Sequence, residues 1–139
     1  MKDRIFLDTN VLVYALDNED VAKQEKAKSI LNEFYNNDNY FLSTQVVQEF
    51  CNVVLKKIEP DVPEGELAEF ISSFPLEQVR MVDINAITKA LSLKARYRYS
   101  FWDSLIIAAA IHADCGILYT EDLKHQQMVD SLKIINPFM

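Results

Sequence analysis

The sequence has few of the residues that interrupt regular structure. Its 139 residues include only two glycines and four prolines, so we expect short loops and a chain dominated by helices and strands. A phosphate-binding loop of the Walker type needs closely spaced glycines, whereas Gly65 and Gly116 stand far apart. The sequence therefore excludes that class of nucleotide-binding protein.

Long apolar runs and cysteine clusters are also missing. No run approaches the ~20 apolar residues that span a bilayer, and the first residues lack the apolar segment of a signal peptide. Cys51 and Cys115 show neither Cys-x-x-Cys spacing nor neighbouring histidines suited to zinc. We expect a cytoplasmic protein with no membrane association and two buried free thiols. A disulfide between the two cysteines is the alternative.

Positive charge is in deficit. The chain has 14 Lys and Arg against 21 Asp and Glu, a formal charge of −7, whereas proteins that bind nucleic acid are usually basic. Metal ions bound by some carboxylates would reduce this negative charge locally, and the cations are partly grouped, at 23–28, 56–57 and 94–98. Because lysines on a helix usually form a solvated face, charge alone leaves the substrate class open.

Size and apolar content fit one domain over residues 1–139. The chain is 50% hydrophobic, enough for one core, and too short for two domains of about 100–200 residues each. Strands are predicted at 5–7, 40–43, 79–82, 117–120 and 133–135, a loop at 60–65, and helices at about 10–16, 21–36, 45–57, 66–73, 86–97 and 103–113. Short strands alternating with helices predict an α/β fold, with a central, mainly parallel sheet flanked by helices on both faces.

Acidic side chains follow the predicted strands at the point where each strand ends. Asp8 comes directly after the first strand, and Glu121 and Asp122 come directly after the strand at 117–120. Glu49 follows the second strand by one helical turn, and Asp103 opens a helix that is apolar on nearly every side. Ligands of parallel sheets bind beyond the carboxyl ends of the strands. We therefore expect these acids at one edge, where oxygen ligands would suit Mg²⁺ or Mn²⁺.

Each acid also has a purely structural explanation. Asp8 could cap the following helix or close an Asx-turn, and Asp103 suits the start of a helix. Asp122 could be an ordinary turn residue. Glu49 could be solvated surface, although it lies at the edge of the apolar stripe of its helix. Four unrelated structural roles are a weaker account than one shared site.

Small polar residues beside the acids are candidates for orienting them. Thr9 could donate a hydrogen bond to a neighbouring carboxylate, and Asn10 could orient a carboxylate or cap a helix. Thr44, with Ser43 before it, has the same two alternatives. Ser104 stands beside the acid of the apolar helix and is similarly divided.

Four segments that contain these residues resemble the successive motifs of PIN-domain nucleases, and most of all the VapC-type toxins of toxin–antitoxin pairs. They are Leu7–Leu12, Ser43–Phe50, Phe101–Ile106 and Leu118–Leu123. The match follows the order of the family over nearly the whole chain, which makes it more specific than any single motif. The resemblance implies the PIN fold.

The resemblance also implies a ligand set. Mg²⁺ or Mn²⁺ would be bound by the catalytic acids Asp8, Glu49, Asp103 and one acid of the Glu121–Asp122 pair. Asp122 is favoured as the fourth ligand, with Glu121 as a second contributor.

One departure from the family falls in the loop after these acids. Close relatives often have a glycine after the histidine of this loop, whereas His125 is followed by Gln126. The shape of this loop is therefore left open. His125 itself is either an exposed loop residue or a contact to substrate phosphate.

In function, the resemblance implies a ribonuclease that hydrolyses RNA and leaves 5′-phosphate and 3′-hydroxyl ends. It implies the toxin of a type II toxin–antitoxin pair, a homodimer that binds a small antitoxin. Interface candidates on the first two helices are Tyr14, Leu16, Phe34 and Tyr35, with core packing as the alternative. A housekeeping PIN nuclease in RNA processing and a non-catalytic RNA- or protein-binding scaffold are the competing functions.

Overall fold

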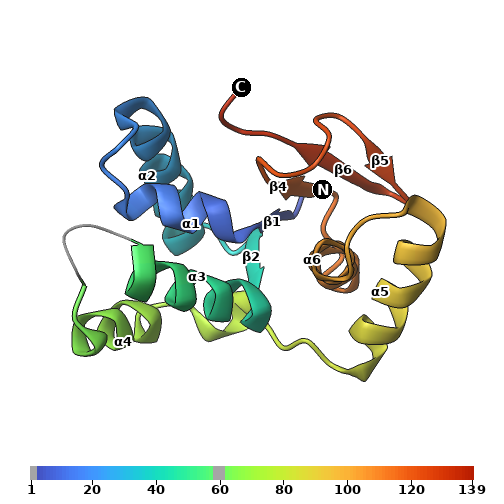
Figure 1. The fold of residues 1–139 in the computed structure, drawn as a ribbon, viewed down its shortest axis with the longest axis horizontal. Coiled ribbons are helices and arrows are strands. Elements are labelled where there is room, and N and C mark those ends of the chain that lie inside the picture. The colour runs from blue at the N-terminus through green and yellow to red at the C-terminus, as the bar shows by residue number, and fades with distance from the viewer. Residues whose placement is uncertain (1–2, 58–61) are drawn as a thin grey trace.

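The computed structural model describes residues 3–57 and 62–139 (Figure 1). The strands are β1 (Ile5–Leu7), β2 (Tyr40–Ser43), β3 (Val79–Arg80), β4 (Ile117–Tyr119), β5 (Met128–Val129) and β6 (Leu132–Ile135). The α-helices are α1 (Thr9–Leu16), α2 (Val21–Asn36), α3 (Thr44–Lys57), α4 (Glu64–Ser72), α5 (Ile84–Tyr97) and α6 (Phe101–His112), and a short 3₁₀ turn, η1, covers Leu76–Gln78.

The strands form one sheet in the order β3-β2-β1-β4-β6-β5. Every neighbouring pair is parallel except β5 and β6, which are antiparallel. The first strand lies inside the sheet, with Phe6 opposite Phe41 of β2 on one side and Leu7 opposite Tyr119 of β4 on the other. The carboxyl ends of β1 and β4 are therefore adjacent, and the predicted mainly parallel sheet is confirmed.

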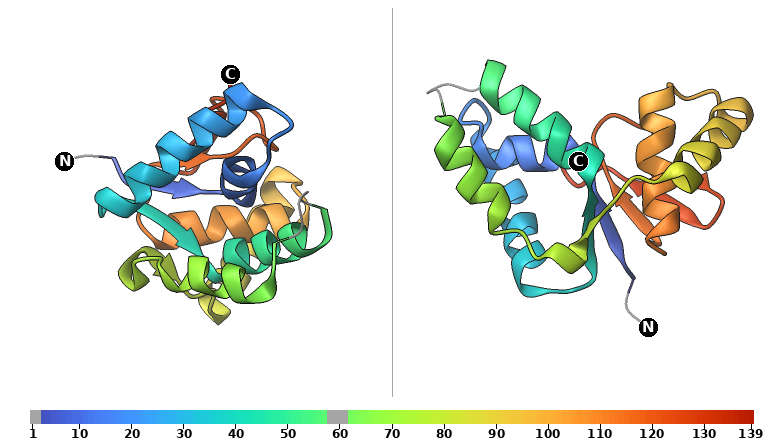
Figure 2. Two further views of the ribbon diagram at one scale, coloured as in Figure 1. Left: turned by 90° about the vertical axis from the view of Figure 1, so that its left-hand side faces the viewer. Right: turned by 90° about the horizontal axis from the view of Figure 1, so that it is seen from below.

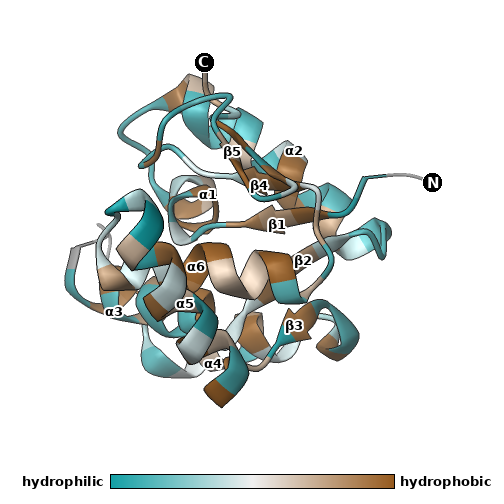
Figure 3. Cartoon of the chain, turned by 90° about the vertical axis from the view of Figure 1, so that its right-hand side faces the viewer, coloured by the Kyte–Doolittle hydropathy of each residue, from teal (hydrophilic) through white to brown (hydrophobic). Residues whose placement is uncertain are grey.

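Helices cover both faces of this sheet, as predicted. Helices α1 to α4 lie on one side and α5 and α6 on the other, as Figure 1 and the right-hand view of Figure 2 both show. Seven of the twelve residues of α6 are buried, because this helix packs between the sheet and α5. Its apolar surface alongside the strands is visible in Figure 3. None of the helices in the described ranges is long and apolar enough to cross a membrane.

Side-chain caps explain where several helices begin. The carboxylates of Asp8, Asp20 and Asp83 each accept a hydrogen bond from a backbone N–H of the first turn that follows, in α1, α2 and α5. The hydroxyl of Ser100 accepts from the N–H of Asp103 in α6. Such caps stabilise a helix by about 1 kcal/mol each, and the cap of α1 places the carboxylate of Asp8 directly at the end of β1.

The core contains the large apolar residues of the central strands and the helix faces against them, and its largest fully buried side chains include Phe6, Phe34, Phe50, Leu42, Leu93, Ile107, Leu118 and Ile134. Phe34 is fully buried, so the core explanation holds for this interface candidate. Both cysteines are free thiols, as predicted, but only Cys115 is buried, and Cys51 is half-buried.

Several predicted boundaries were wrong. The strand expected at 79–82 ends at Arg80, because the N–H of Val82 donates to the side-chain hydroxyl of Thr44 and not to a strand. The helix expected from 66 begins at Glu64, so Gly65 is helical and not part of a loop; residues 60 and 61 of that predicted loop lie outside the described ranges. The helix expected from 103 begins two residues earlier, at Phe101. Strand β5 was not predicted.

Candidate active site

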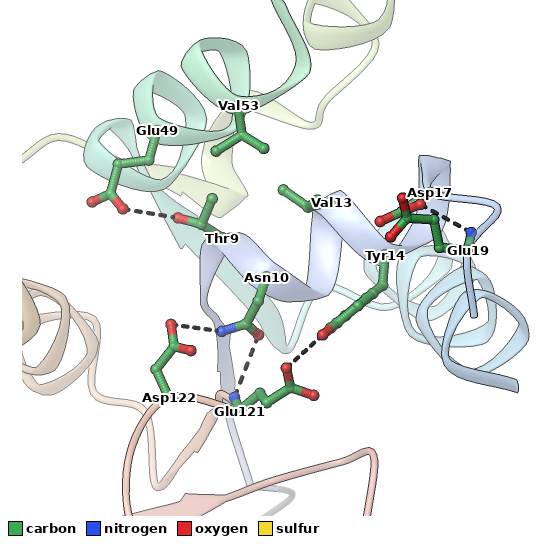
Figure 4. A pocket seen from close by; sticks show the side chains of 10 residues that line it. All are labelled: Thr9, Asn10, Val13, Tyr14, Asp17, Glu19, Glu49, Val53, Glu121 and Asp122. Carbon is green, nitrogen blue, oxygen red and sulfur yellow. Dashed lines mark hydrogen bonds between the residues drawn. The ribbon is translucent and has the colours of Figure 1, made fainter. Parts of the chain in front are cut away.

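A cleft of about 490 Å³ opens at the carboxyl ends of β1 and β4 (Figure 4). Its walls come from α1 and the turn after it, from α3, and from the loop that follows β4. It is lined by Thr9, Asn10, Val13, Tyr14, Asp17, Glu19, Glu49, Val53, Glu121 and Asp122. Five of these are acidic, and none of the described residues that line it is basic. A cleft with this lining attracts cations.

Asp8 lies beneath this cleft at the end of β1, only 5% exposed. Its Oδ1 accepts from the N–H of Thr9 at 2.7 Å, and its Oδ2 accepts from the hydroxyl of Thr120 at 2.8 Å. Burial raises its pKa from 3.8 to about 6, although these two hydrogen bonds lower it. The value of about 6 already includes a smaller rise from the charges of Asp122 and Glu49. Asp8 is thus both a helix cap and a buried carboxyl whose ionised form is disfavoured by neighbouring negative charges.

Thr120 connects the strand ends. It is fully buried, and its hydroxyl, which donates to Asp8, accepts from the N–H of Asp122 at 3.1 Å. The amide of Asn10 donates to Oδ2 of Asp122 at 3.1 Å and accepts from the N–H of Glu121 at 3.4 Å. Asn10 therefore orients a carboxylate, one of its two predicted roles, and holds α1 against the loop after β4.

Glu49 forms the opposite wall of the cleft. Its Oε2 accepts from the hydroxyl of Thr9 at 3.5 Å, and its Oε1 accepts from Nε2 of Gln45 at 2.6 Å. The same Nε2 donates to the backbone oxygen of Trp102 at 3.2 Å. Gln45 thus links Glu49 to the first turn of α6, where Asp103 is the next residue.

The two acids after β4 point differently. Asp122 is exposed and faces the cleft beside Asn10 (Figure 4). Glu121 turns toward α2, where its Oε2 meets Nζ of Lys23 at 2.6 Å and its Oε1 accepts from the hydroxyl of Tyr14. Burial raises the pKa of Glu121, but the hydrogen bonds from Lys23 and Tyr14 outweigh it, and the pKa lies below its ordinary value.

The remaining predicted site residues, Asp103, Ser104 and Thr44, do not line the cleft. Asp103 is half-buried in the first turn of α6, where a carboxylate complements the helix dipole. Ser104 is fully buried, and its hydroxyl has no hydrogen-bond partner among the described residues. Thr44 accepts from the N–H of Val82, at the join of β2 and β3.

His125 does not line the cleft, and its ring Nδ1 has a partner elsewhere. That nitrogen accepts the backbone N–H of Asn136 at 2.9 Å, which ties the loop to the end of β6. Its side chain is half-buried, so the expected exposed loop residue was wrong, and a contact to substrate phosphate stays a prediction. Gln126, where relatives often have glycine, adopts the left-handed conformation with φ 70°.

The side chains that the sequence did not reveal are Thr120, Gln45 and Lys23. Thr120 had a signal, because residues that follow adjacent parallel strands must meet, and Thr120 follows Tyr119 as Asp8 follows Leu7. The amide of Gln45 had a weaker one: it lies four residues before Glu49, and side chains at this spacing meet on a helix. Nothing in the sequence pairs Lys23 with Glu121.

The donor chemistry of this edge fits a hard divalent cation. Glu49 and Asp122 present carboxylate oxygens from opposite walls, and such oxygen ligands suit Mg²⁺ or Mn²⁺. A cation here would also favour ionised Asp8, whose pKa is raised by burial and by like charges. Within the described ranges, no group of three Asp, Glu, His or Cys side chains is close enough to hold a metal ion. The role of the acids as ligands stays a prediction.

Comparison with known proteins establishes the family. Residues 5–130 match the model of the PIN domain, and the chain belongs to this family. Among curated protein sequences, none matches it significantly.

Solved structures share the fold at low sequence identity. FitAcB from Neisseria gonorrhoeae has a TM-score of 0.68 and 17% identity, over 96% of this chain and 98% of that one. VapBC2 from Rickettsia felis, bound to a DNA fragment from their promoter, has a TM-score of 0.66 and 20% identity, over 94% of this chain and 96% of that one. The Mycobacterium tuberculosis toxin VapC20, which cleaves the sarcin-ricin loop, has a TM-score of 0.63 and 19% identity, over 85% of this chain and 89% of that one. These similarities concern the fold.

Proposed function

We propose that this protein is a metal-dependent endoribonuclease of the cytoplasm and the toxin of a type II toxin–antitoxin pair. The observation that carries the proposal is that Asp8, Glu49 and Asp122 lie around one edge of a PIN-domain sheet, near enough for the charges of Glu49 and Asp122 to raise the pKa of Asp8. Thr9, Asn10 and Thr120 hold these carboxylates in place. The family and the toxin structures that share the fold support the same conclusion.

In this proposal Asp8, Glu49, Asp103 and Asp122 bind Mg²⁺ or Mn²⁺. Bound at this edge, the ions would neutralise the scissile phosphate and supply activated water. Asp122 lines the cleft, and only its Oδ2 accepts a hydrogen bond, from Asn10, which supports it as the fourth ligand. Glu121 has both carboxylate oxygens bonded to Lys23 and Tyr14, which argues for a minor contribution.

The acidic lining of the cleft supports a proposal for how the protein is inhibited. A guanidinium group forms paired hydrogen bonds with carboxylates, so an arginine of a small antitoxin would bind among Glu49, Asp122 and the acids Asp17 and Glu19. The same insertion would displace the metal ions. We propose a homodimer of this chain as the form that the antitoxin binds, by analogy with the toxin–antitoxin structures of the same fold.

Two single substitutions test the nuclease assignment. Asp8→Asn and Asp103→Asn preserve side-chain shape, so both variants should fold and both should lose RNA cleavage in the presence of Mg²⁺ or Mn²⁺. Asp38→Asn is the matched control, because Asp38 is an exposed acid in the loop before β2, at the opposite edge of the sheet. Full activity in both site variants would contradict the assignment.

Metal binding and toxicity separate the competing functions. Calorimetric titration should show Mg²⁺ or Mn²⁺ binding by the wild type and loss of binding in Asp8→Asn; an absence of binding and cleavage would favour a non-catalytic scaffold. Induced expression should arrest growth, with relief by the product of an adjacent small gene. Normal growth despite active enzyme would favour a housekeeping nuclease. Sequencing the 5′ ends of cleaved RNA would identify the target.

A further inference from the structure

The single tryptophan of the chain lies exposed beside the candidate active site. Trp102 is 63% exposed on the first turn of α6. Covering an exposed indole ring is energetically favourable, because an aromatic side chain removes about 150–250 Å² of surface from water when it is buried. The backbone oxygen of the same residue accepts the hydrogen bond from Gln45 that also fixes Glu49. The backbone that carries the exposed ring is therefore held one residue from the acid of α6.

A second pocket, of about 450 Å³, lies under this ring. It is lined by Gln45, Gln48, Glu49, Asn52 and Trp102. Its volume falls in the range of about 300–1,000 Å³ that is usual for sites of small ligands. Glu49 lines both this pocket and the acidic cleft, so whatever occupies one lies next to whatever occupies the other.

The residues that line the second pocket have the chemistry that recognises a nucleobase. The amides of Gln45, Gln48 and Asn52 recur at helical spacing, so they lie on one face of α3. Amide side chains offer both donors and acceptors, which suits the edges of a base. An exposed aromatic ring stacks on the face of an unpaired base. Of the five lining residues, Glu49 is the only charged one.

We propose that this pocket, the Trp102 pocket, binds one unpaired base of the RNA next to the phosphate that is cut. The base stacks on the indole of Trp102, and the exposed amides of Gln48 and Asn52 contact its edge. This inference rests on the proposed nuclease function. Because a paired base cannot leave its stack without cost, the pocket selects single-stranded segments.

Gln45 makes the spacing between base and cut site rigid. Both atoms that face its Nε2, the carboxylate of Glu49 and the carbonyl of Trp102, are acceptors. Only the NH₂ end of the amide can satisfy them, so its orientation is fixed. The edge of the Phe101 ring packs on the indole, with centroids 5.2 Å apart. The pocket therefore sets the cleavage position at a constant distance from the bound base.

Fluorescence tests the stacking directly, because all tryptophan emission comes from Trp102. A short single-stranded RNA is titrated into the wild type in EDTA, beside an abasic oligomer with the same number of phosphates. The base-containing RNA should quench the emission to saturation, and the abasic oligomer should not. Equal quenching by both oligomers, or quenching by neither, would mean that no base stacks on Trp102 and would overturn the proposal. The ring would then be free to serve as a contact for another partner, such as an antitoxin.

Steady-state cleavage with Mg²⁺ supplies the second measurement. Stacking of one base changes affinity roughly 5- to 150-fold, so Trp102→Leu should raise KM at least about 5-fold and leave kcat within about twofold. Trp102→Phe should restore most of the affinity. Gln48→Ala and Asn52→Ala should change which base flanks the cut. Leu91→Ala removes an equally exposed side chain from α5 and should leave KM unchanged.

The two hypotheses fail in different ways. A wild type that cuts RNA, with Trp102→Leu unchanged in KM and in cleavage position, contradicts the Trp102 pocket and leaves the nuclease intact. A wild type that cuts no RNA contradicts the nuclease, and the quenching experiment then decides the pocket alone.

Discussion

Asp8→Asn should make the metal-free protein more stable while it destroys the activity. The carboxyl of Asp8 is 5% exposed, and burial raises its pKa from 3.8 to about 6. A raised pKa means that the folded state binds the proton more tightly than the unfolded chain does. The folded state is therefore favoured below about pH 4 and loses this contribution as the pH rises toward 6.

The magnitude follows from the difference between the two pKa values. At 1.36 kcal/mol for each pH unit, the interval from 3.8 to about 6 corresponds to about 3 kcal/mol of destabilisation at neutral pH. Asparagine avoids the charge but matches the hydrogen bonds from Thr9 and Thr120 less well than a protonated carboxyl. We expect a net gain of about 1–3 kcal/mol in the free energy of unfolding.

Urea denaturation in EDTA measures this gain at about pH 7.5 and about pH 4. The advantage of Asp8→Asn should be largest at the higher pH and should shrink toward zero at the lower one, while Asp38→Asn should match the wild type at both. The reasoning would be refuted if the variant were less stable than the wild type at about pH 7.5. It would also be refuted if the difference in the free energy of unfolding were the same at both pH values. Added Mg²⁺ should stabilise the wild type more than the variant, because the carboxylate of Asp8 is one of the ligands in the proposed site.

Three further substitutions follow from the same contacts. Thr120→Val removes the hydroxyl that donates to Asp8 and lowers its pKa, so NMR titration should find the pKa of Asp8 above about 6, and an unchanged pKa would exclude this role. Gln45→Leu frees Glu49 and should reduce kcat about 10- to 100-fold, as losses of such supporting contacts do, with an unchanged circular dichroism spectrum; wild-type kcat would show that the contact is dispensable. Gln126→Gly relieves a left-handed φ of 70° and should stabilise the fold by about 0.5–1 kcal/mol, measured by thermal unfolding with no change in cleavage; a loss of stability would contradict the strain.

The sequence predicted that Asp8 and Asp122 lie close together at the ends of two strands. Asp8 and Asp122 follow strands that pair in parallel, and parallel strands bring their carboxyl ends to one edge whatever the helices between them do. The alternating apolar segments were also sufficient to predict that helices cover both faces of the sheet. Strands that are apolar on both faces, and a helix such as α6 that is apolar all round, must be buried on every side.

Details that depend on packing were not predictable in the same way. The orientation of Glu121 away from the cleft depends on Lys23 and Tyr14, which approach it only when α1 and α2 pack together. Strand β5 has two residues and is held by antiparallel pairing with β6, which is too short for any periodicity to show. The end of β3 depends on Thr44, a side chain that substitutes for a strand partner.

The order of synthesis gives the sheet topology a further consequence. Asn10 and Thr120, which touch across the strand ends, are 110 residues apart in the chain, and a ribosome adds ~5–20 residues each second. The first strand thus waits on the order of ten seconds for its neighbour β4. Throughout that interval the nascent polypeptide carries Asp8 and Glu49 without the residues that complete the cleft. Any chain released early, before residue 122, lacks the finished centre altogether.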